Sequence, residues 1–364
     1  MEAIVIYGGS FDPIHNGHLR IARAASMLLN ADVVFVPAKG PRWKEPDTTP
    51  GQRLAMLKAA LKKEGSPSFS IDTFEMRDKA EVNYTIDTIR HFALKYKRRK
   101  LYLLIGADQV NAFPKWKDPD LICRLATPVY VSRPGVEIDD SVLARYSMMR
   151  LDYDKSGDVS SSKVRSLQSL DIPSCVKDYI VTNKLYFMKK IEGMISPHRL
   201  AHSVSVAELA YFIAKKAKLE NADAAYIAGL LHDIAKGMSK EQQAEAMKKL
   251  FPEFESFPPW TYHQFLGAHI AETEFGIEDR AVLDAILYHA TGRARMTPLG
   301  KVVYASDKIE PLRGYDSNDM ISECLKDYYL GFLYVLRENK KYLESKGYQA
   351  DNPLTRACFD QYLR

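Results

Sequence analysis

The pattern of apolar residues changes at about residue 187, and this change constrains the fold more than any other feature. Before that point, short apolar runs rich in β-branched and aromatic residues alternate with segments of helical period. Such alternation is typical of a parallel sheet with helices packed on it. After that point only helical patterns follow. We therefore expect an α/β domain over residues 1–187 and an all-α helical bundle over residues 188–364.

The patterns also place individual elements. Strand patterns lie at residues 3–7, 33–37, 69–71, 101–105 and 128–132, and helical patterns of the second half include residues 203–218, 223–235, 240–250 and 265–275. The two halves meet at Leu185-Tyr186-Phe187-Met188, which contains neither proline nor glycine. We expect a short and fairly stiff join.

Composition excludes several classes of protein. The apolar runs are far too short to cross a bilayer, and the first residues lack a signal-peptide pattern, so we expect a cytoplasmic protein that binds no membrane. The four cysteines are scattered without a CxxC pair, which disfavours disulfides and a thiolate zinc site. A net charge of +5 over 364 residues gives no indication of nucleic-acid binding. The sequence leaves the oligomeric state open, and a homo-oligomer is compatible with it.

A glycine-rich segment, GGSFDPIHNGH at residues 8–18, follows the first expected strand and precedes a helical pattern. Gly8 and Gly9 let the backbone approach a ligand closely. A helix that starts near Gly17 directs its free amides and positive dipole end at an anion. His15 and His18, three residues apart at that helix start, can face the same phosphate. Ligands of α/β sheets bind at such strand ends, so the sequence predicts a phosphate site here.

This segment resembles the (T/H)xGH signature of the nucleotidyltransferase superfamily, and residues 1–187 are similar to bacterial nicotinate-nucleotide adenylyltransferase, the NadD family. The family's second motif, ISSTxxR, has its counterpart in VSSSKVR at residues 159–165, where serine hydroxyls can cap a helix and Arg165 can bind a phosphate. Further matches are NYTIDT at residues 83–88, GAD at residues 106–108, Trp116, and RPG at residues 133–135.

The resemblance implies a Rossmann-like fold and adenylyl transfer from ATP, with Mg²⁺ bound to the triphosphate, to nicotinate mononucleotide. His15 and His18 would stabilise the ATP phosphates as pyrophosphate leaves and deamido-NAD forms. Thr85 and Trp116 would hold the pyridine mononucleotide, and an indole suits stacking on a pyridine ring, although a packing role for Trp116 stays open. The implied catalytic residues are His15, His18, Lys44 and Arg165, and the implied substrate-binding residues are Gly8, Gly9, Ser10, Phe11, Thr85, Gly106, Asp108, Trp116, Arg133, Ser161 and Ser162.

One loop departs from the family pattern. Where the family commonly has a PPHK-like stretch, this chain has PRWK at residues 41–44, so a histidine is missing although Lys44 can still bind a phosphate. Pantetheine-phosphate adenylyltransferase and the cytidylyltransferases remain alternatives within the superfamily. The match at residues 84–88 and Trp116 favour the pyridine substrate, and acid versus amide stays open.

Histidines and aspartates form a second cluster in the helical half: His202, His232-Asp233, His263, His289 and Asp307. The His-Asp pair follows the apolar run at residues 228–231, and an adjacent buried pair of this kind is costly unless something satisfies it. Imidazole and carboxylate together suit iron, manganese or zinc. The sequence therefore predicts a metal centre.

The order of these residues resembles the HD phosphohydrolase superfamily, and residues 189–364 are similar to the YqeK family of symmetrical diadenosine tetraphosphate (Ap4A) hydrolases. The match rests on RLAH at residues 199–202, LHDIAK at residues 231–236 and ASDKIEP at residues 305–311. It implies iron or another divalent transition metal and hydrolysis of Ap4A to two ADP. The implied metal ligands are His202, His232, Asp233 (also catalytic) and Asp307, and the residues implied to contact nucleotide or a second metal are Arg199, Lys236, His263, His289, Arg313, Asn352 and Thr355.

Two other functions for the second half stay open. It could be a regulatory module that senses a nucleotide, or it could hydrolyse another nucleoside polyphosphate, since the fold alone does not fix the substrate. Retention of the full ligand set favours catalysis, because a sensor could lose Asp233 or Asp307 without penalty.

Overall fold

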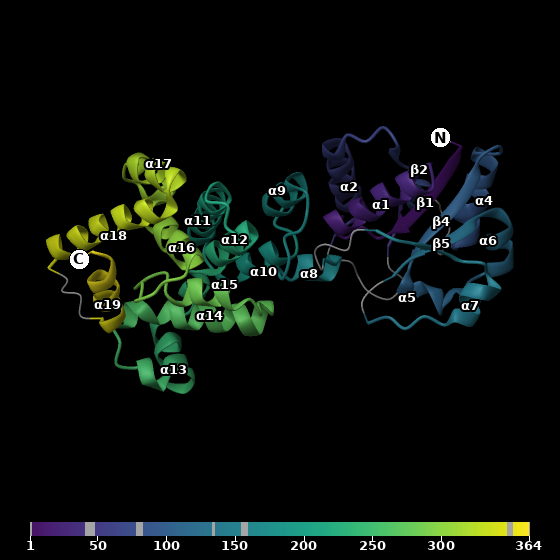
Figure 1. Ribbon diagram of the computed structural model, residues 1–364. Helices are drawn as coiled ribbons and strands as arrows, with labels where there is room; N and C mark the ends of the chain where they lie inside the picture. Colours follow the sequence, from purple (N-terminus) through teal and green to yellow (C-terminus); the bar gives the residue numbers. More distant parts are fainter. Residues whose placement is uncertain are drawn as a thin grey trace. The chain divides into compact units, whose positions relative to one another are not determined.

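The computed structural model describes residues 2–40, 48–77, 83–132, 135–153, 159–347 and 352–363 (Figure 1). It divides into two compact units. The first contains the chain up to Arg165 together with Asp171–Leu185, and the second contains Ser166–Leu170 together with the chain from Tyr186 onward. The division thus differs from the expected one at 187/188, because Tyr186 already caps the first helix of the second unit. Each unit is described by itself below.

The first unit is built on a six-stranded sheet in which all neighbouring strands are parallel. Its strands are β1 (Ala3–Gly9), β2 (Ala31–Pro37), β3 (Phe69–Ile71), β4 (Lys100–Gly106), β5 (Thr127–Val131) and β6 (Met149–Leu151). Their order is β3-β2-β1-β4-β5-β6, which is that of a doubly wound Rossmann-type sheet. The order reverses between β1 and β4, where such folds bind their ligands.

Both faces of the sheet are covered by helices. Successive strand residues point to opposite faces. Ile4 and Ile6 therefore share one face and pack in a cluster with residues of α4 and α6, while α1 contacts β1 and β2. Figure 1 shows α1 and α2 on one side of the strands and α4 and α6 on the other. The helices are α1 (Asn16–Leu28), α2 (Pro50–Glu64), α3 (Phe74–Arg77), α4 (Thr85–Lys95), α5 (Ala107–Val110), α6 (Pro119–Leu125), α7 (Asp140–Arg145), α8 (Ser161–Arg165) and α9 (Ser174–Thr182).

The second unit is helical throughout its described part. Its helices are α10 (Phe187–Met194), α11 (Pro197–Lys216), α12 (Ala222–Leu231), α13 (Lys240–Leu250), α14 (Tyr262–Phe275), α15 (Arg280–Leu287), α16 (Pro298–Ile309), α17 (Asn318–Lys326), α18 (Tyr328–Ser345) and α19 (Pro353–Tyr362). Helices α11, α12, α15 and α16 contact one another and form the centre of the bundle. Among the described residues, no helix is both long and apolar enough to cross a membrane.

Close approach of α11 and α12 depends on a glycine. A Cβ built on Gly229 of α12 would lie 2.8 Å from the Cα of Ala207 in α11, closer than real Cβ atoms come to backbone. Ser196 and Asn221 cap the two helices through their side-chain oxygens, which satisfies amides at the helix starts. The caps and the glycine together fix where the ends of these helices lie. His202 lies in α11, and His232-Asp233 come directly after α12.

Candidate active sites

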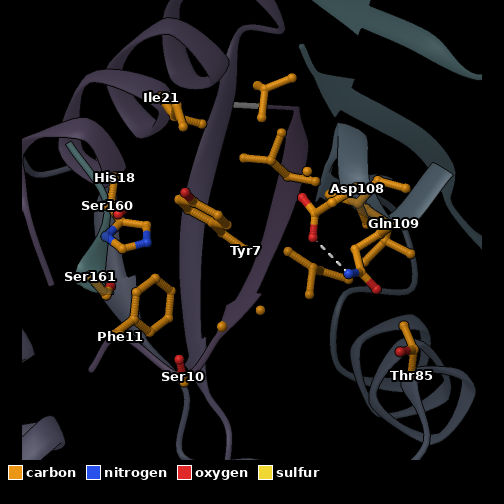
Figure 2. A pocket seen from close by; sticks show the side chains of 18 of the residues that line it. Tyr7, Ser10, Phe11, His18, Ile21, Thr85, Asp108, Gln109, Ser160 and Ser161 are labelled. Carbon is orange, nitrogen blue, oxygen red and sulfur yellow. Dashed lines mark hydrogen bonds between the residues drawn. The ribbon is translucent and has the colours of Figure 1, made fainter. Parts of the chain in front are cut away.

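A cavity of about 580 Å³ lies in the first unit at the carboxyl ends of β1 and β4, where the strand order reverses (Figure 2). One wall comes from residues 8–11, at the end of β1 and just beyond it, and another from Gly106 at the end of β4 with Asp108 and Gln109 after it. The cavity therefore lies at the position where doubly wound sheets bind their ligands.

His15 and His18 orient each other at the start of α1. His15 is the N-cap: its Nδ1 accepts from the backbone N–H of His18 at 3.4 Å, while Nδ1 of His18 accepts from the backbone N–H of His15 at 3.2 Å. The two rings stack with centroids 3.6 Å apart. A neutral imidazole that accepts through Nδ1 carries its proton on Nε2. Both side chains line the cavity as Nε2–H donors, at a helix end that itself favours an anion.

The glycine between the two histidines is required for this arrangement. A Cβ on Gly17 would lie 2.9 Å from Nδ1 of His15 and 3.0 Å from Cγ1 of Val159. Any larger residue would push the His15 ring away from the amide that it accepts from. The motif therefore requires glycine directly before His18, because a side chain there would collide with the His15 ring.

Two side chains of α8 hold the loop between β1 and α1. Ser161 Oγ donates to the carbonyl of Pro13 at 2.9 Å, and Arg165 Nη1 donates to the carbonyl of Asp12 at 2.6 Å. Both residues also line the cavity. From the sequence, the serines were expected to cap a helix and bind substrate and Arg165 to bind a phosphate, and these contacts with the loop backbone were missed.

Phe11 has a buried ring as well as a place on the cavity wall. The ring is 1% exposed and packs edge-on against Tyr7 at 5.6 Å between centroids. Its backbone φ is +47°, in the left-handed region that non-glycine residues seldom adopt. The buried ring therefore fixes the position of the loop between β1 and α1.

The far part of the cavity contains Thr85, the first residue of α4, and Trp116. Trp116 also packs on Phe113, with ring centroids 5.0 Å apart, so its packing role and its place in the cavity coexist. Glu75 lies there too and accepts from Thr88 Oγ1 at 2.7 Å. Burial raises the pKa of Glu75, and the hydrogen bond from Thr88 offsets only part of the effect.

The structure thus gathers most of the expected residues of this site around one cavity. They are Gly8, Gly9, Ser10, Phe11, His15, His18, Thr85, Gly106, Asp108, Trp116, Ser161, Ser162 and Arg165. Lys44 and Arg133 lie outside the described residues. Lining residues that sequence reasoning missed include Tyr7, Glu75, Thr88, Gln109 and Ser160.

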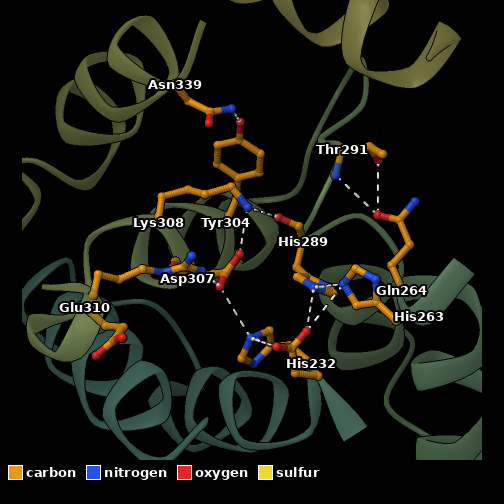
Figure 3. Close-up of polar contacts among 12 residues, drawn as sticks. His232, His263, Gln264, His289, Thr291, Tyr304, Asp307, Lys308, Glu310 and Asn339 are labelled. Carbon is orange, nitrogen blue, oxygen red and sulfur yellow. Dashed lines mark hydrogen bonds and ion pairs between the residues drawn. The ribbon is translucent and has the colours of Figure 1, made fainter. Parts of the chain in front are cut away.

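The second site is a cluster of buried histidines and aspartates in the helical unit (Figure 3). His202 comes from α11, His232-Asp233 follow α12, and Asp307 comes from α16. The Nε2 atoms of His202 and His232 are 3.2 Å apart, and Oδ1 of Asp307 lies 3.3 and 3.4 Å from them. Oδ2 of Asp233 lies 3.6 Å from Nε2 of His232. The donor atoms of His202, His232 and Asp233 lie within 4.8 Å of one another, and so do those of His232, His289 and Asp307, which is close enough for each trio to bind a cation.

His263 and His289 form a second pair beside the first. Their Nε2 atoms are 3.0 Å apart and lie 3.4 and 3.6 Å from Oδ1 of Asp233. Asp233 therefore directs one carboxylate oxygen at each histidine pair. Figure 3 shows His263 and His289 facing each other above His232.

Every histidine of the cluster is oriented through its Nδ1. Nδ1 of His232 lies 2.7 Å from the carbonyl oxygen of Gly229, and Nδ1 of His289 lies 2.7 Å from that of Ile286. Nδ1 of His263 lies 2.8 Å from the carbonyl oxygen of Trp260, and Nδ1 of His202 lies 2.9 Å from Oε1 of Glu310. Because these oxygens can only accept, each Nδ1 carries a proton and each neutral ring turns an Nε2 lone pair inward. Lone pairs about 3 Å apart repel unless a cation or a proton lies between them, so the donor set fits a metal ion.

The charges around the cluster favour ionised aspartates. Burial opposes ionisation of Asp233, but the positive charge that His232 carries when it is protonated holds the pKa of Asp233 well below the usual value. Burial likewise opposes ionisation of Asp307, but the positive charge of Lys308 keeps its pKa well below the usual value. Burial lowers the pKa of His263 and of His289, which favours the neutral imidazoles that bind metals.

Arg199, Lys236 and Arg313 are among the cationic side chains that border the cluster. Arg199 Nη1 lies 2.5 Å from Oδ2 of Asp233, and Arg313 donates to Asp307. Burial lowers the pKa of Lys236, although Asp233 opposes the shift. Sequence reasoning expected these three residues here.

Asn352 and Thr355 were also expected at this site, and the structure places them at the start of α19. Oδ1 of Asn352 caps that helix by accepting from the amides of Leu354 and Thr355. No contact described for the visible part of the chain joins them to the histidine cluster. Two residues that do touch the cluster were missed: Glu310, and Lys308, whose Nζ lies 2.6 Å from Oδ2 of Asp307. Both belong to the motif at residues 305–311, which was the available signal.

Comparisons with known proteins match different parts of the chain to different families. The Cytidylyltransferase-like family model matches residues 6–167, and the HD domain model matches residues 199–312. Two solved structures are similar to parts of the chain. An HD superfamily hydrolase from Clostridium acetobutylicum is 28% identical and covers 48% of this chain and 96% of its own, with a TM-score of 0.44. A nicotinic acid mononucleotide adenylyltransferase from Plasmodium falciparum, complexed with NaAD, is 20% identical and covers 52% of this chain and 98% of its own, with a TM-score of 0.43.

Two relatives span both halves. "Probable nicotinate-nucleotide adenylyltransferase/Ap4A hydrolase" from Mycoplasma pneumoniae is 30% identical over 92% of this chain and 98% of its own. The protein of the same name from Mycoplasma genitalium is 32% identical over 86% of this chain and 88% of its own. Since the similarity runs through both units and nearly the full length of these relatives, the protein belongs to the family of bifunctional nicotinate-nucleotide adenylyltransferase/Ap4A hydrolases.

Proposed function

We propose that the first unit transfers the adenylyl group of ATP to nicotinate mononucleotide, and that the second unit hydrolyses Ap4A to two ADP. The first activity is supported by the pair of Nε2–H donors that His15 and His18 present at the helix start beside the cavity. The second is supported by the four inward-facing imidazoles around Asp233.

In the first site, a phosphate oxygen of the mononucleotide attacks the α-phosphorus of ATP, and the bond to the leaving pyrophosphate breaks. No covalent bond to the protein is needed, so the residues act by placing the reactants and stabilising charge. His15 and His18 donate to the ATP phosphates together with the amides that begin α1. Mg²⁺ accompanies the triphosphate. The other phosphate-binding residues are Ser10, Lys44, Arg133, Ser161, Ser162 and Arg165.

The two ends of the dinucleotide occupy different parts of the cavity. Trp116 stacks on the pyridine ring and Thr85 donates to the mononucleotide. Gly106 and Asp108, after β4, contact the adenosine. The backbone of Gly8, Gly9 and Phe11 passes close to the phosphates between them, where small residues allow contact.

In the second site, His202, His232, Asp233 and Asp307 hold the divalent cation, which is iron or another transition metal. When bound, such a cation lowers the pKa of a coordinated water. Water attacks a phosphorus of the central phosphoanhydride of Ap4A, the bridging P–O bond breaks, and one ADP leaves as the other forms. Oδ1 of Asp233 accepts the proton of the attacking water. His263 and His289 contact phosphate oxygens or a second cation. The positive groups that neutralise the polyphosphate are Arg199, Lys236 and Arg313, and Asn352 and Thr355 hold the nucleoside.

The purified protein tests both assignments. It is incubated with nicotinate mononucleotide and ATP, and separately with Ap4A, and both product mixtures are separated by chromatography. Deamido-NAD and ADP are the expected products. Nicotinamide mononucleotide as the better acceptor would contradict the first assignment, and ATP plus AMP from Ap4A would contradict the second.

We also propose that the protein works in the cytoplasm. All four cysteines lie among the described residues and are free, as is usual in a reducing compartment. Fractionation of the producing cells tests this location.

A further inference from the structure

Arg53 of α2 is a fully buried charged residue that the proposed mechanism does not use. Its side chain is 0% exposed. Nη1 donates to the carbonyl of Ser10 at 2.7 Å and to that of Ala38 at 2.9 Å, and Nη2 donates to the carbonyl of Lys39 at 2.8 Å. Burial of a charged group is costly, so a side chain in this position needs an explanation.

The three carbonyls belong to two segments that follow neighbouring strands. Ser10 lies in the loop after β1 that contributes to the cavity wall, and Ala38 and Lys39 come directly after β2. The segments also meet where the amide of Ala38 donates to the carbonyl of Gly9 at 2.9 Å. Arg53 thus connects both segments to the first turns of α2.

The hydrogen bond from Arg53 to the carbonyl of Ser10 also sets the direction of the next amide, that of Phe11. In a planar trans peptide the C=O and the following N–H point in opposite directions. The carbonyl of Ser10 points inward to buried Arg53, so the N–H of Phe11 points outward from it. Ser10 and Phe11 both line the cavity, whereas Arg53 does not.

We propose that Arg53 is a positioning residue for ATP binding, which holds the Ser10–Phe11 peptide so that the Phe11 amide donates to an ATP phosphate. Its planar fork can reach three carbonyls at once, whereas a lysine ammonium is a single point on a flexible stem. The inference rests on the proposed adenylyl transfer only in naming ATP as the ligand.

The test compares Arg53→Lys with the whole wild-type chain. We expect the KM for ATP to rise about tenfold or more, because at least one hydrogen bond from a charged donor is lost. The KM for nicotinate mononucleotide and the rate of Ap4A hydrolysis should change less than about twofold. Arg23→Lys is the matched control: Arg23 ties α1 to α2 through Glu64 at the surface, with Nε and Oε1 2.6 Å apart, and its replacement should leave both KM values unchanged.

Hydrogen exchange at the peptide covering residues 8–12 gives a second readout that does not depend on the acceptor. ATP should slow exchange there in the wild type and in Arg23→Lys, and much less in Arg53→Lys. If the wild type shows this protection but makes no dinucleotide, the proposed reaction fails and the role of Arg53 stands. An unchanged ATP KM and unchanged protection in Arg53→Lys would overturn the inference. So would an Arg53→Lys and an Arg53→Gln variant whose first units both fail to fold, since the residue would then serve folding alone.

Discussion

The histidines of the two sites adopt opposite tautomers, and in both sites the hydrogen-bond partner of Nδ1 determines which one. At the first site, Nδ1 of His15 and of His18 accepts from a backbone amide, which leaves a proton on Nε2. At the second site, Nδ1 of His232 and of its partners faces an oxygen that can only accept, which leaves a lone pair on Nε2. A donor suits a phosphate and a lone pair suits a metal ion, so the backbone around each ring sets its chemistry.

The dual role of His15 as helix cap and phosphate donor can be separated. Asparagine is a good N-cap, so His15→Asn should preserve the start of α1 but remove the Nε2–H donor. We expect the kcat of dinucleotide synthesis to fall roughly 100-fold, the usual cost of losing one donor to a reacting group. Thermal unfolding should stay close to that of the wild type. Synthesis within a few-fold of the wild-type rate would show that the ring acts only as a cap.

Glu310 is the residue that orients His202. Its carboxylate is 1% exposed, faces Nδ1 of His202 and accepts from the amide of Leu312 at 2.7 Å. Glu310→Gln should weaken metal binding by about 10–100-fold, because the ring loses its charged partner. Metal content after dialysis against a graded series of chelator concentrations measures this directly. Glu323→Gln, which changes an exposed partner of Lys326, is the control, and equal metal retention in both variants would contradict the role.

At the scale of elements, the sequence predicts segments with a clear apolar pattern well and segments without one poorly. The helix expected at residues 240–250 is α13, and the strand expected at residues 69–71 is β3. The three-residue edge strand β6 was missed, because its exposed Met149-Arg150 carries no apolar run. The helix expected at residues 223–235 ends at Leu231 instead, and a separate 3-10 turn covers Ile234–Gly237. The apolar pattern continues past the end of α12 and into the 3-10 turn, so the sequence alone does not show where either begins or ends.

The candidate sites follow the same rule. Motif residues such as His15, His232 and Asp307 could be predicted because several chemical groups occur at fixed spacing. Arg53 could not, because it acts as a single polar residue through contacts between separate segments, and Glu310 was marked only by its place in the motif at residues 305–311. Their importance depends on burial, which a single sequence does not reveal.

The contact between α11 and α12 gives a prediction about this pair of helices. Gly229→Ala places a methyl group against the backbone of Ala207, so the helices must separate. We expect the second unit to lose about 1–3 kcal/mol of unfolding free energy, measured by thermal or denaturant unfolding. Gly193→Ala in α10 is the control, since a Cβ there meets nothing within 4 Å. Removing a helical glycine should leave stability unchanged or raise it slightly. Equal effects of the two changes would contradict the steric explanation.

At the scale of the whole molecule, the two activities should be lost separately. His15→Ala should abolish dinucleotide synthesis and leave Ap4A hydrolysis at the wild-type rate, because the cluster around Asp233 contains no residue of the first cavity. Asp233→Ala should do the reverse, because it removes the carboxylate between the two histidine pairs. Both rates are measured on the same preparation after folding is checked by circular dichroism. Loss of both activities in either folded variant would contradict independent sites.

The path of the chain between the two units has a practical consequence for cloning. The chain passes from one unit to the other between Arg165 and Ser166, between Leu170 and Asp171, and between Leu185 and Tyr186. A gene fragment that ends near residue 187 therefore removes Ser166–Leu170 from the unit against which it packs. Leu167 and Leu170, which are 0% and 5% exposed, would face water in such a fragment and favour aggregation. Because the chain crosses between the units three times rather than once, each activity is best assayed in the undivided chain.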